Sequence, residues 1–357
     1  MSHTSLVVRA VDVGYGHVKF TDGCDPHDKS IRTDSIPSQS PVARTDTVDG
    51  PGVLAQRDTF LVPVGDRLFE VGRDIRLALH GTQITEDLSA DFCLSDGYAA
   101  RLFGAINYMQ LPDNVIDVLV LGLPITTYQK HHQDLAKRFV GPHRINSRGT
   151  SVRIERCQVY PQPLGSYMTY LVSGAATSQA PHALVIDPGY NTFDWFVCHG
   201  MAANAANSGA VERGMGAVLR AIAEDIIKKI SGIDATPMDL VRAIDRSLTT
   251  GQPLRLYGQE FDLAPHLAAG APIFEEAARA LKNAVRSSAE LDVIILTGGG
   301  ATLYAETIRN HFPRHPVVTL DDPAMANVRG FQIIGDRLAK SLGQALRLQE
   351  GHAAAAA

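Results

Sequence analysis

The sequence predicts an α/β protein built from two domains of similar design, and three observations carry this prediction. The chain has 357 residues, of which 45% are hydrophobic, and this length exceeds what a single hydrophobic core usually organises. Short β-branched segments alternate with segments of helical periodicity. A strand, a glycine-containing turn and a return strand open the chain and recur beyond residue 181, which indicates an internal repeat.

The first half begins with a hairpin, because residues 6–13 and 18–21 have strand character on either side of Gly14-Tyr15-Gly16. Residues 31–56 are rich in Pro, Ser, Thr and Asp, which predicts loops or an irregular subdomain. Residues 60–64 and 67–71 predict a second, smaller hairpin. Periodicity then predicts helices over 95–109, 128–140 and 164–173, and strands over 115–122 and 151–159.

A stretch of Gly, Ala, Ser, Gln and Pro over residues 173–181 predicts a linker between the halves. The second half then repeats the opening pattern, with strands over 183–186 and 192–198 around the turn 187–191. Further helices are expected over 217–230, 237–247 and 273–287, and a buried strand over 293–297 leads into three consecutive glycines. The low-complexity tail, residues 352–357, predicts either a disordered end or a non-native addition.

Charge and composition exclude several classes of protein. The 33 Lys and Arg against 38 Asp and Glu leave a net charge of -5 with no basic block, which disfavours direct nucleic-acid binding. Apolar runs fall well short of the roughly 20 residues of a membrane helix, and the first residues do not resemble a secretory signal. We therefore expect a cytoplasmic protein. Its four scattered cysteines are expected to be free thiols.

The first hairpin turn carries residues that suit a phosphate group. Its glycines let backbone N–H groups line one concavity, and Asp12 stands at the strand end, where a carboxylate can hold the water shell of Mg²⁺. Lys19, on the return strand, could reach a phosphate as a point charge. Taken alone, an ordinary glycine-rich hairpin with a surface lysine explains this segment as well.

The second hairpin turn repeats this construction. Asp187 ends its strand, and Thr192 supplies a hydroxyl group where a phosphate oxygen or a metal-bound water needs a donor. Pro188 removes one backbone donor, which would weaken phosphate contact on that side. Two such loops, one near the start of each half, suit a nucleotide held between two domains.

A third element is the run Gly298-Gly299-Gly300, which follows a strand and precedes a helix. Three glycines permit close approach of the backbone to a base and sugar, with the helix N-terminus facing negative charge. The spacing matches neither a Rossmann fingerprint nor a Walker loop, and a flexible β-α turn is the alternative interpretation. Residues 212–216 precede another helix and could contact ribose, or could form only a helix start with a local ion pair.

Taken together, these residues resemble the actin-like ATPase superfamily, which includes sugar kinases, chaperones and actin. Five of its motifs occur in the family's order: the first phosphate loop (12–19), the first connector (159–166), the second phosphate loop (187–194), the adenosine motif (296–301) and the second connector (326–331). The chain length, the Gly-Gly-Gly-Ala adenosine motif and the Ala-Asn-x-x-Gly-Phe connector are most similar to the ParM/StbA branch of plasmid-segregation proteins.

The resemblance implies an α/β fold of the actin-like, ribonuclease H-like type, with a nucleotide in the cleft between two domains. Residues 1–178 would form the first domain, with a C-terminal helix over about 325–350 packing back on it, and residues 179–324 the second. The implied cofactors are ATP and Mg²⁺.

The resemblance also implies roles for the matching residues. Asp12 and Asp187 would bind Mg²⁺ through water and take part in catalysis, Lys19 would neutralise phosphate charge, and Gln162 would orient the attacking water. The branch often has Glu where Gln162 stands, and a neutral amide there implies slow hydrolysis. The remaining nucleotide contacts would come from Gly14, Tyr15, Gly16, Gly189, Tyr190, Asn191 and Thr192 for the phosphates, and from Gly298, Gly299 and Gly300 for adenosine.

The function that the resemblance implies is an ATP-driven polymer: monomers bind ATP, assemble head to tail into filaments, and a DNA-binding adaptor links the filament to plasmid DNA. No membrane partner is expected. Two alternatives share the fold. A small-molecule kinase would need a general base, for which Asp194 is one of few candidates, and a regulatory ATPase would hydrolyse ATP without polymerising.

Overall fold

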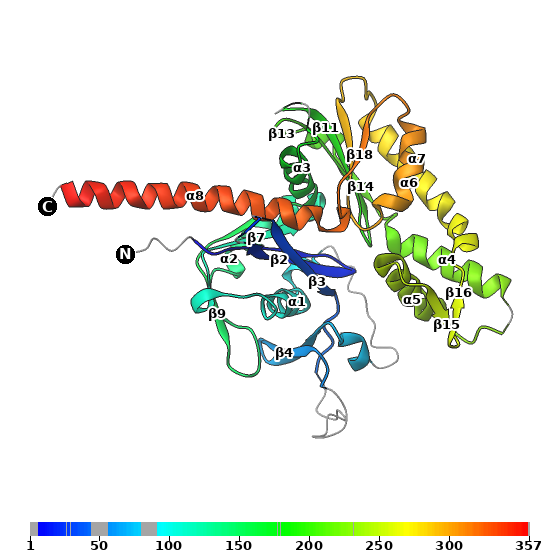
Figure 1. The fold of residues 1–357 in the computed structure, drawn as a ribbon, viewed down its shortest axis with the longest axis horizontal. Helices are drawn as coiled ribbons and strands as arrows, with labels where there is room; N and C mark the ends of the chain where they lie inside the picture. Colours follow the sequence, from blue (N-terminus) through cyan, green and yellow to red (C-terminus); the bar gives the residue numbers. More distant parts are fainter. Residues whose placement is uncertain are drawn as a thin grey trace. The chain divides into compact units, whose positions relative to one another are not determined.

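A computed structural model describes residues 6–25, 27–28, 30–43, 56–79, 91–176, 178, 180–230 and 232–355, with side chains up to residue 345. The chain divides into two compact units (Figure 1). Unit 1 comprises Met1–Ser173 and Met325–Ala357, and unit 2 comprises Gly174–Ala324. The chain thus leaves unit 1 at residue 173, whereas the expected boundary was 178.

Unit 1 is built on a five-stranded sheet with the order β10-β7-β1-β2-β3. The chain enters through an antiparallel hairpin, and parallel strands are added on the β1 side. Every residue of β1 and β7 is buried, as expected for central strands that are covered on both faces. The strands are β1 (Val8–Val13), β2 (His17–Cys24), β3 (Ile31–Pro37), β7 (Val118–Leu123) and β10 (Cys157–Pro161).

Helices cover the sheet of unit 1, and small strands form two further sheets. Ser95 caps the first helix, because its side chain accepts a hydrogen bond from the Tyr98 N–H at 3.1 Å. The helices are α1 (Asp96–Ile106), α2 (Ile125–Arg138), α3 (Gln162–Val172) and α8 (Ala326–Ala355), with short 3-10 helices at Ile75–Ala78, Phe92–Leu94 and Pro112–Asn114. The small strands are β4 (Thr59–Val64) with β5 (Arg67–Gly72), and β6 (Val115–Ile116), β8 (Gly141–Arg144) and β9 (Ser151–Ile154).

Helices α3 and α8 cross at two glycines. A Cβ atom on Gly330 would lie 1.7 Å from the carbonyl oxygen of Gly165, so neither backbone leaves room for a side chain. Beside the crossing, the Ser166 hydroxyl donates to Asn327 Oδ1 at 2.6 Å, and both side chains are buried. The two segments that the sequence identified as connectors are therefore packed directly against each other within unit 1.

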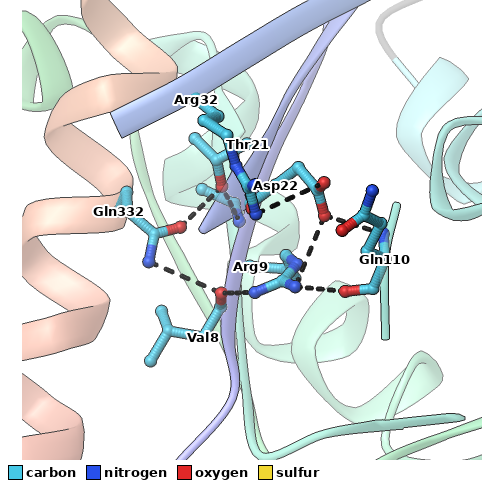
Figure 2. Close-up of polar contacts among 8 residues, drawn as sticks. Val8, Arg9, Thr21, Asp22, Arg32, Gln110 and Gln332 are labelled. Atoms are coloured by element: carbon cyan, nitrogen blue, oxygen red, sulfur yellow. Dashed lines mark hydrogen bonds and ion pairs between the residues drawn. The ribbon is translucent and has the colours of Figure 1, made fainter. Parts of the chain in front are cut away.

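A buried polar contact ties α8 to the sheet (Figure 2). The Thr21 hydroxyl donates to Gln332 Oε1 at 2.6 Å and accepts from the Ala10 N–H at 2.9 Å. Nearby, Arg9 donates to the carbonyl oxygens of Val8 and Gln110, and burial lowers the pKa of this guanidinium. The Thr21 hydroxyl and the Ala10 N–H each meet an acceptor, as buried donors require, whereas Arg9 Nε is buried without a hydrogen-bond partner among the described residues.

Unit 2 repeats the arrangement of unit 1. Its sheet has the order β13-β12-β11-β17-β18, and β14 also pairs with β12. An antiparallel hairpin again comes first, and two parallel strands are added on the side of its first strand. The strands are β11 (His182–Pro188), β12 (Phe193–His199), β13 (Ala202–Ala203), β14 (Gly209–Val211), β17 (Val293–Leu296) and β18 (Val317–Thr319).

Four helices pack on this sheet and on one another. Thr236 and Asp239 form a reciprocal capping box at the start of α5. The helices are α4 (Met215–Lys229), α5 (Pro237–Thr250), α6 (Ala271–Val285) and α7 (Ala301–His311), with 3-10 helices at Ala205–Asn207, Ala264–Gly270 and Pro323–Met325. A small hairpin joins β15 (Leu254–Leu256) to β16 (Gln259–Phe261).

The α/β class and the repeated hairpin are confirmed, and three local expectations are wrong. Residues 31–37 form β3, because a third strand pairs along β2 despite the polar sequence. The single strand expected over 151–159 is two strands, β9 and β10, in different sheets. Helix α8 continues to Ala355, where a disordered end was one of the two expectations. Within the described residues, no helix combines the length and apolar character needed to cross a bilayer.

Candidate functional site

The turn that joins β1 to β2 is closed by the backbone of Gly14. Its N–H donates to the carbonyl oxygens of Asp12 and His17, each at 3.1 Å. A Cβ atom at this position would lie 2.9 Å from the His17 oxygen, so a residue with a side chain would open the turn. Ser38, just beyond β3, binds the same turn twice. Its hydroxyl donates to the Gly14 carbonyl oxygen, and its N–H donates to the Gly16 carbonyl oxygen.

The turn between β11 and β12 has the same construction. The Gly189 N–H donates to the Asp187 carbonyl oxygen at 3.0 Å and to the Thr192 carbonyl oxygen at 2.9 Å. Since the two turns share the spacing Asp-x-Gly and the same pair of acceptors, the repeat seen in the sequence is also a repeat of hydrogen bonding.

Both turn glycines have partners inside their own turns. The N–H groups of Gly14 and Gly189 each donate to two carbonyl oxygens there. Thr192 is likewise engaged, because its hydroxyl donates to Asp194 Oδ2. The structure therefore gives these three residues a role in shaping the turns.

Asp12 and Gln162 meet at the carboxyl end of the sheet of unit 1. Gln162 begins α3, directly after β10, and its Nε2 donates to Asp12 Oδ1 at 2.6 Å. Asp12 is only 2% exposed, so its carboxylate must obtain hydrogen bonds from protein groups such as the Gln162 amide instead of from bulk water. Both residues were expected in the catalytic site, with separate roles, and they are 150 positions apart in the chain.

Lys19 lies directly opposite Asp12 in the β1–β2 register, which places both side chains on one face of the sheet. In unit 2 the same register position pairs Asp187 with Asp194, so the second turn has an acidic residue where the first has lysine. His17, in the first turn, stays neutral near pH 7, because burial, with the charges of Lys19 and Arg76, lowers its pKa to about 4.

The second loop and the triple glycine lie against each other. Gly298 has a φ of +79°, and a Cβ atom there would lie 2.1 Å from Asp187 Oδ1. The Gly300 N–H donates to the Pro188 carbonyl oxygen at 3.1 Å, so Pro188 contributes an acceptor that the sequence did not indicate. Nothing lies within 4 Å of the position a Cβ atom on Gly299 would take, which leaves open space on that side of the motif.

The start of α4 also packs on the second loop. The Gly216 N–H donates to the Tyr190 carbonyl oxygen at 2.7 Å, and the Gly214 N–H donates to the Asn191 carbonyl oxygen at 3.2 Å. A Cβ atom on Gly214 would lie 2.6 Å from the backbone of this loop. The neighbouring Arg213 forms an exposed ion pair with Glu276 at 2.6 Å. The ion pair of Arg213 is therefore with a residue 63 positions away rather than the local pair expected at the helix start, and residues 214–216 support the loop.

The structure thus brings the expected site residues together in two sets, one in each unit. Asp12, Lys19 and Gln162 gather at the first turn, whereas Tyr15 packs its ring 5.6 Å from that of Phe92. Asp187, Thr192 and the triple glycine gather at the second turn. The supporting residue Ser38 was missed, because no local pattern marks a serine that bonds to a turn 24 residues away.

Comparison with known families matches each half of the chain to a different domain model. A model described as the N-terminal domain of actin like proteins matches residues 10–165. A model of the C-terminal domain of archaeal MreB-like actin homologues matches residues 185–310. Both turns lie within these ranges, and so does the first connector except for residue 166. A search of curated proteins found no match.

Solved structures of similar fold span nearly the whole chain. The ADP complex of Ta0583, an archaeal actin homologue, is 20% identical with a TM-score of 0.72, over 93% of this chain and 100% of that one. The apo psk41 ParM protein is 19% identical with a TM-score of 0.67, over 95% and 100%. A 15-stranded ParM filament from Clostridium botulinum is 17% identical with a TM-score of 0.68, over 94% and 100%. At these identities the likeness concerns the fold.

Proposed function

Because this chain belongs to the actin-like ATPase superfamily, we propose that it binds ATP with Mg²⁺, hydrolyses it slowly and polymerises into filaments. The observation that carries the proposal is the turn built twice, in which an aspartate is the second-last residue of a strand and a glycine N–H closes the loop with the same two acceptors. We further propose that the protein is cytoplasmic and that its filaments segregate plasmid DNA through a DNA-binding adaptor.

In this proposal the phosphates lie against the amides that follow the two turn glycines, including those of Gly16 and Asn191. Lys19 neutralises phosphate charge from the strand that returns after the first turn. The two buried carboxylates, Asp12 and Asp187, are hard oxygen ligands and fit Mg²⁺, which takes one or two carboxylates and keeps several waters. When bound, the ion would offset negative charge on the phosphate oxygens.

Gln162 positions the attacking water in the proposed reaction. Its Nε2 is held by Asp12, which orients the side-chain amide and leaves Oε1 to accept a hydrogen bond from a water. An amide is a weaker proton acceptor than a carboxylate, so it aligns the water without taking its proton. Phosphoryl transfer depends mainly on positioning and charge stabilisation, so we expect slow but measurable hydrolysis.

On the adenosine side, we propose that Gly299 admits the nucleotide. The position of its absent Cβ atom is open, whereas Gly298 and Gly300 are packed against the second loop. A side chain at 299 would therefore enter the space proposed for the nucleotide without disturbing the loop itself.

Polymerisation is tested by light scattering and pelleting across a protein concentration series with Mg²⁺ and ATP, ADP or no nucleotide. We expect a sharp concentration threshold with ATP. Asp187→Ala should abolish the threshold and ATP binding, whereas Glu260→Ala, which removes an exposed carboxylate on β16, should retain ATP binding. Thermal unfolding without nucleotide establishes that both variants are folded.

The outcome separates the proposal from its alternatives. Assembly that needs ATP and is lost in Asp187→Ala supports both the filament and the assigned residues. ATP turnover without assembly at any concentration would contradict the filament and favour a kinase or regulatory ATPase of the same fold, and dependence on an added acceptor alcohol would identify the kinase.

A further inference from the structure

A cavity of about 430 Å³ opens on unit 1, away from the residues proposed to bind ATP. It lies between the end of β4, helix α1, the C-terminal end of α2 and strand β8. None of its lining residues belongs to the two turns, the connectors or the triple glycine. Its volume falls in the range of pockets that hold small ligands, about 300–1,000 Å³.

One side of the cavity is apolar and aromatic. The rings of Phe103 and Phe139 meet edge to face with centroids 5.8 Å apart, and Pro63 and Val64 add half-buried aliphatic surface. The His143 ring lies 5.1 Å from that of Phe103. Its Nε2 lies 3.0 Å from the Phe139 carbonyl oxygen, which can only accept, so Nε2 carries the proton. Burial lowers the pKa of His143, so near neutral pH this ring extends the uncharged wall.

The other side of the cavity carries an excess of positive charge. Arg138 donates to the carbonyl oxygens of Leu94 and Ser95 and lies 3.4 Å from Asp96, but Asp96 is shared with Arg67 at 2.6 Å. Arg144 also lines the cavity. It is held by two backbone carbonyl oxygens of the following loop, at 3.2 and 2.9 Å, and within the described part of the chain no acidic side chain pairs with it.

We propose that this cavity binds a monocarboxylate with a compact apolar body, the carboxylate toward Arg144 and Arg138 and the body against Pro63, Val64 and Phe103. A guanidinium presents paired donors that match a carboxylate, and Arg144 is held in place by backbone carbonyl oxygens, so little side-chain freedom is lost on binding. The ligand is either a free acid or the C-terminal residue of a peptide, since both present the same group.

The test is calorimetric titration of the full chain with phenylacetate and with its neutral analogue phenylacetamide. For a ligand of this size we expect a dissociation constant of about 1 mM for the acid, and at least about tenfold weaker binding of the amide, because it removes a charge-assisted contact. Saturating ATP with Mg²⁺ should leave phenylacetate binding unchanged.

Two variants and a matched control locate the site. Arg144→Gln should weaken phenylacetate binding about tenfold or more, whereas Arg153→Gln, on the exposed face of β9, should leave it unchanged. Val64→Trp, which keeps both arginines and fills the cavity, should also abolish binding. Thermal unfolding reports whether each variant is folded, and Val64→Trp remains informative if Arg144→Gln does not fold.

Acetyl-glycyl-phenylalanine and its C-terminal amide distinguish the two sources of the carboxylate. Tighter binding of the free-carboxylate peptide than of phenylacetate indicates a peptide terminus, and equal or weaker binding indicates a free acid. Equal affinity for phenylacetate and phenylacetamide, or unchanged binding in folded Arg144→Gln, would overturn the proposal.

Discussion

Replacing Gln162 by glutamate tests the contact at the centre of the first loop. The side chain keeps its shape, but the Nε2 donor that lies 2.6 Å from Asp12 Oδ1 becomes an oxygen. Two carboxyl groups then face each other where Asp12 is 2% exposed. Because two negative charges at this distance repel each other strongly, we expect the pair of carboxyl groups to keep one proton near neutral pH.

The size of the effect follows from Coulomb's law. Two unit charges at about 4 Å and an effective dielectric constant of about 20 repel by about 4 kcal/mol, which corresponds to about 3 pKa units. The pKa of the introduced carboxyl therefore rises above its ordinary value of about 4.3. The folded state then holds more protons than the unfolded state, so the free energy of unfolding falls as pH rises through this window.

The assay is urea unfolding of the wild type and Gln162→Glu at pH 5 and pH 8 without nucleotide. We expect the free energy of unfolding of Gln162→Glu to fall below that of the wild type by about 3 kcal/mol more at pH 8 than at pH 5. Gln158→Glu, the same change at an exposed position of β10, should show similar deficits at both pH values. Equal deficits for Gln162→Glu at the two pH values would refute the contact with Asp12.

Three further predictions concern the helix crossing and the two turns. Gly330→Ala places a Cβ atom 1.7 Å from the Gly165 oxygen and should lower the free energy of unfolding by about 3 kcal/mol; a change below about 1 kcal/mol in urea titrations would contradict the crossing. Gly298→Ala forces a strained backbone and displaces the Asp187 carboxylate. Titration with a fluorescent ATP analogue should therefore show binding weakened about tenfold or more. Unchanged affinity would argue against this site. Burial lowers the pKa of His17 to about 4, so the free energy of unfolding should fall by at most about 3 kcal/mol as pH falls from about 6.5 toward 4. His17→Gln should remove this pH-dependent loss, which is measured by comparing urea unfolding at pH 4.5 and pH 7.5.

Local signals explain why the two hairpins could be predicted. Each consists of neighbouring strands joined by a short turn, and the glycine that closes each turn bonds within five residues of chain. Strand propensity and turn chemistry act over the same short range. For that reason Asp12 and Asp187 could be placed at strand ends from the sequence.

Long-range contacts explain what the sequence did not predict. Strand β3 has a polar sequence and exists because β2 offers it an edge to pair with. Ser38 holds the first turn across 24 residues, and the carbonyl oxygen of Pro188 accepts from Gly300. Every backbone has carbonyl groups and many loops have serines, so their partners depend on where distant segments fold.

The sequence by itself determined the α/β class, the duplicated hairpin and the residue types available at each loop, because these follow from periodicity and turn chemistry within short segments. The tertiary structure alone decided which of those groups act together. It joins Gln162 to Asp12 and leaves Arg144 at a cavity without an acidic partner among the described residues. A hydrogen bond needs its donor within about 3 Å and in line with its acceptor, and only the folded chain sets that distance for residues far apart in sequence.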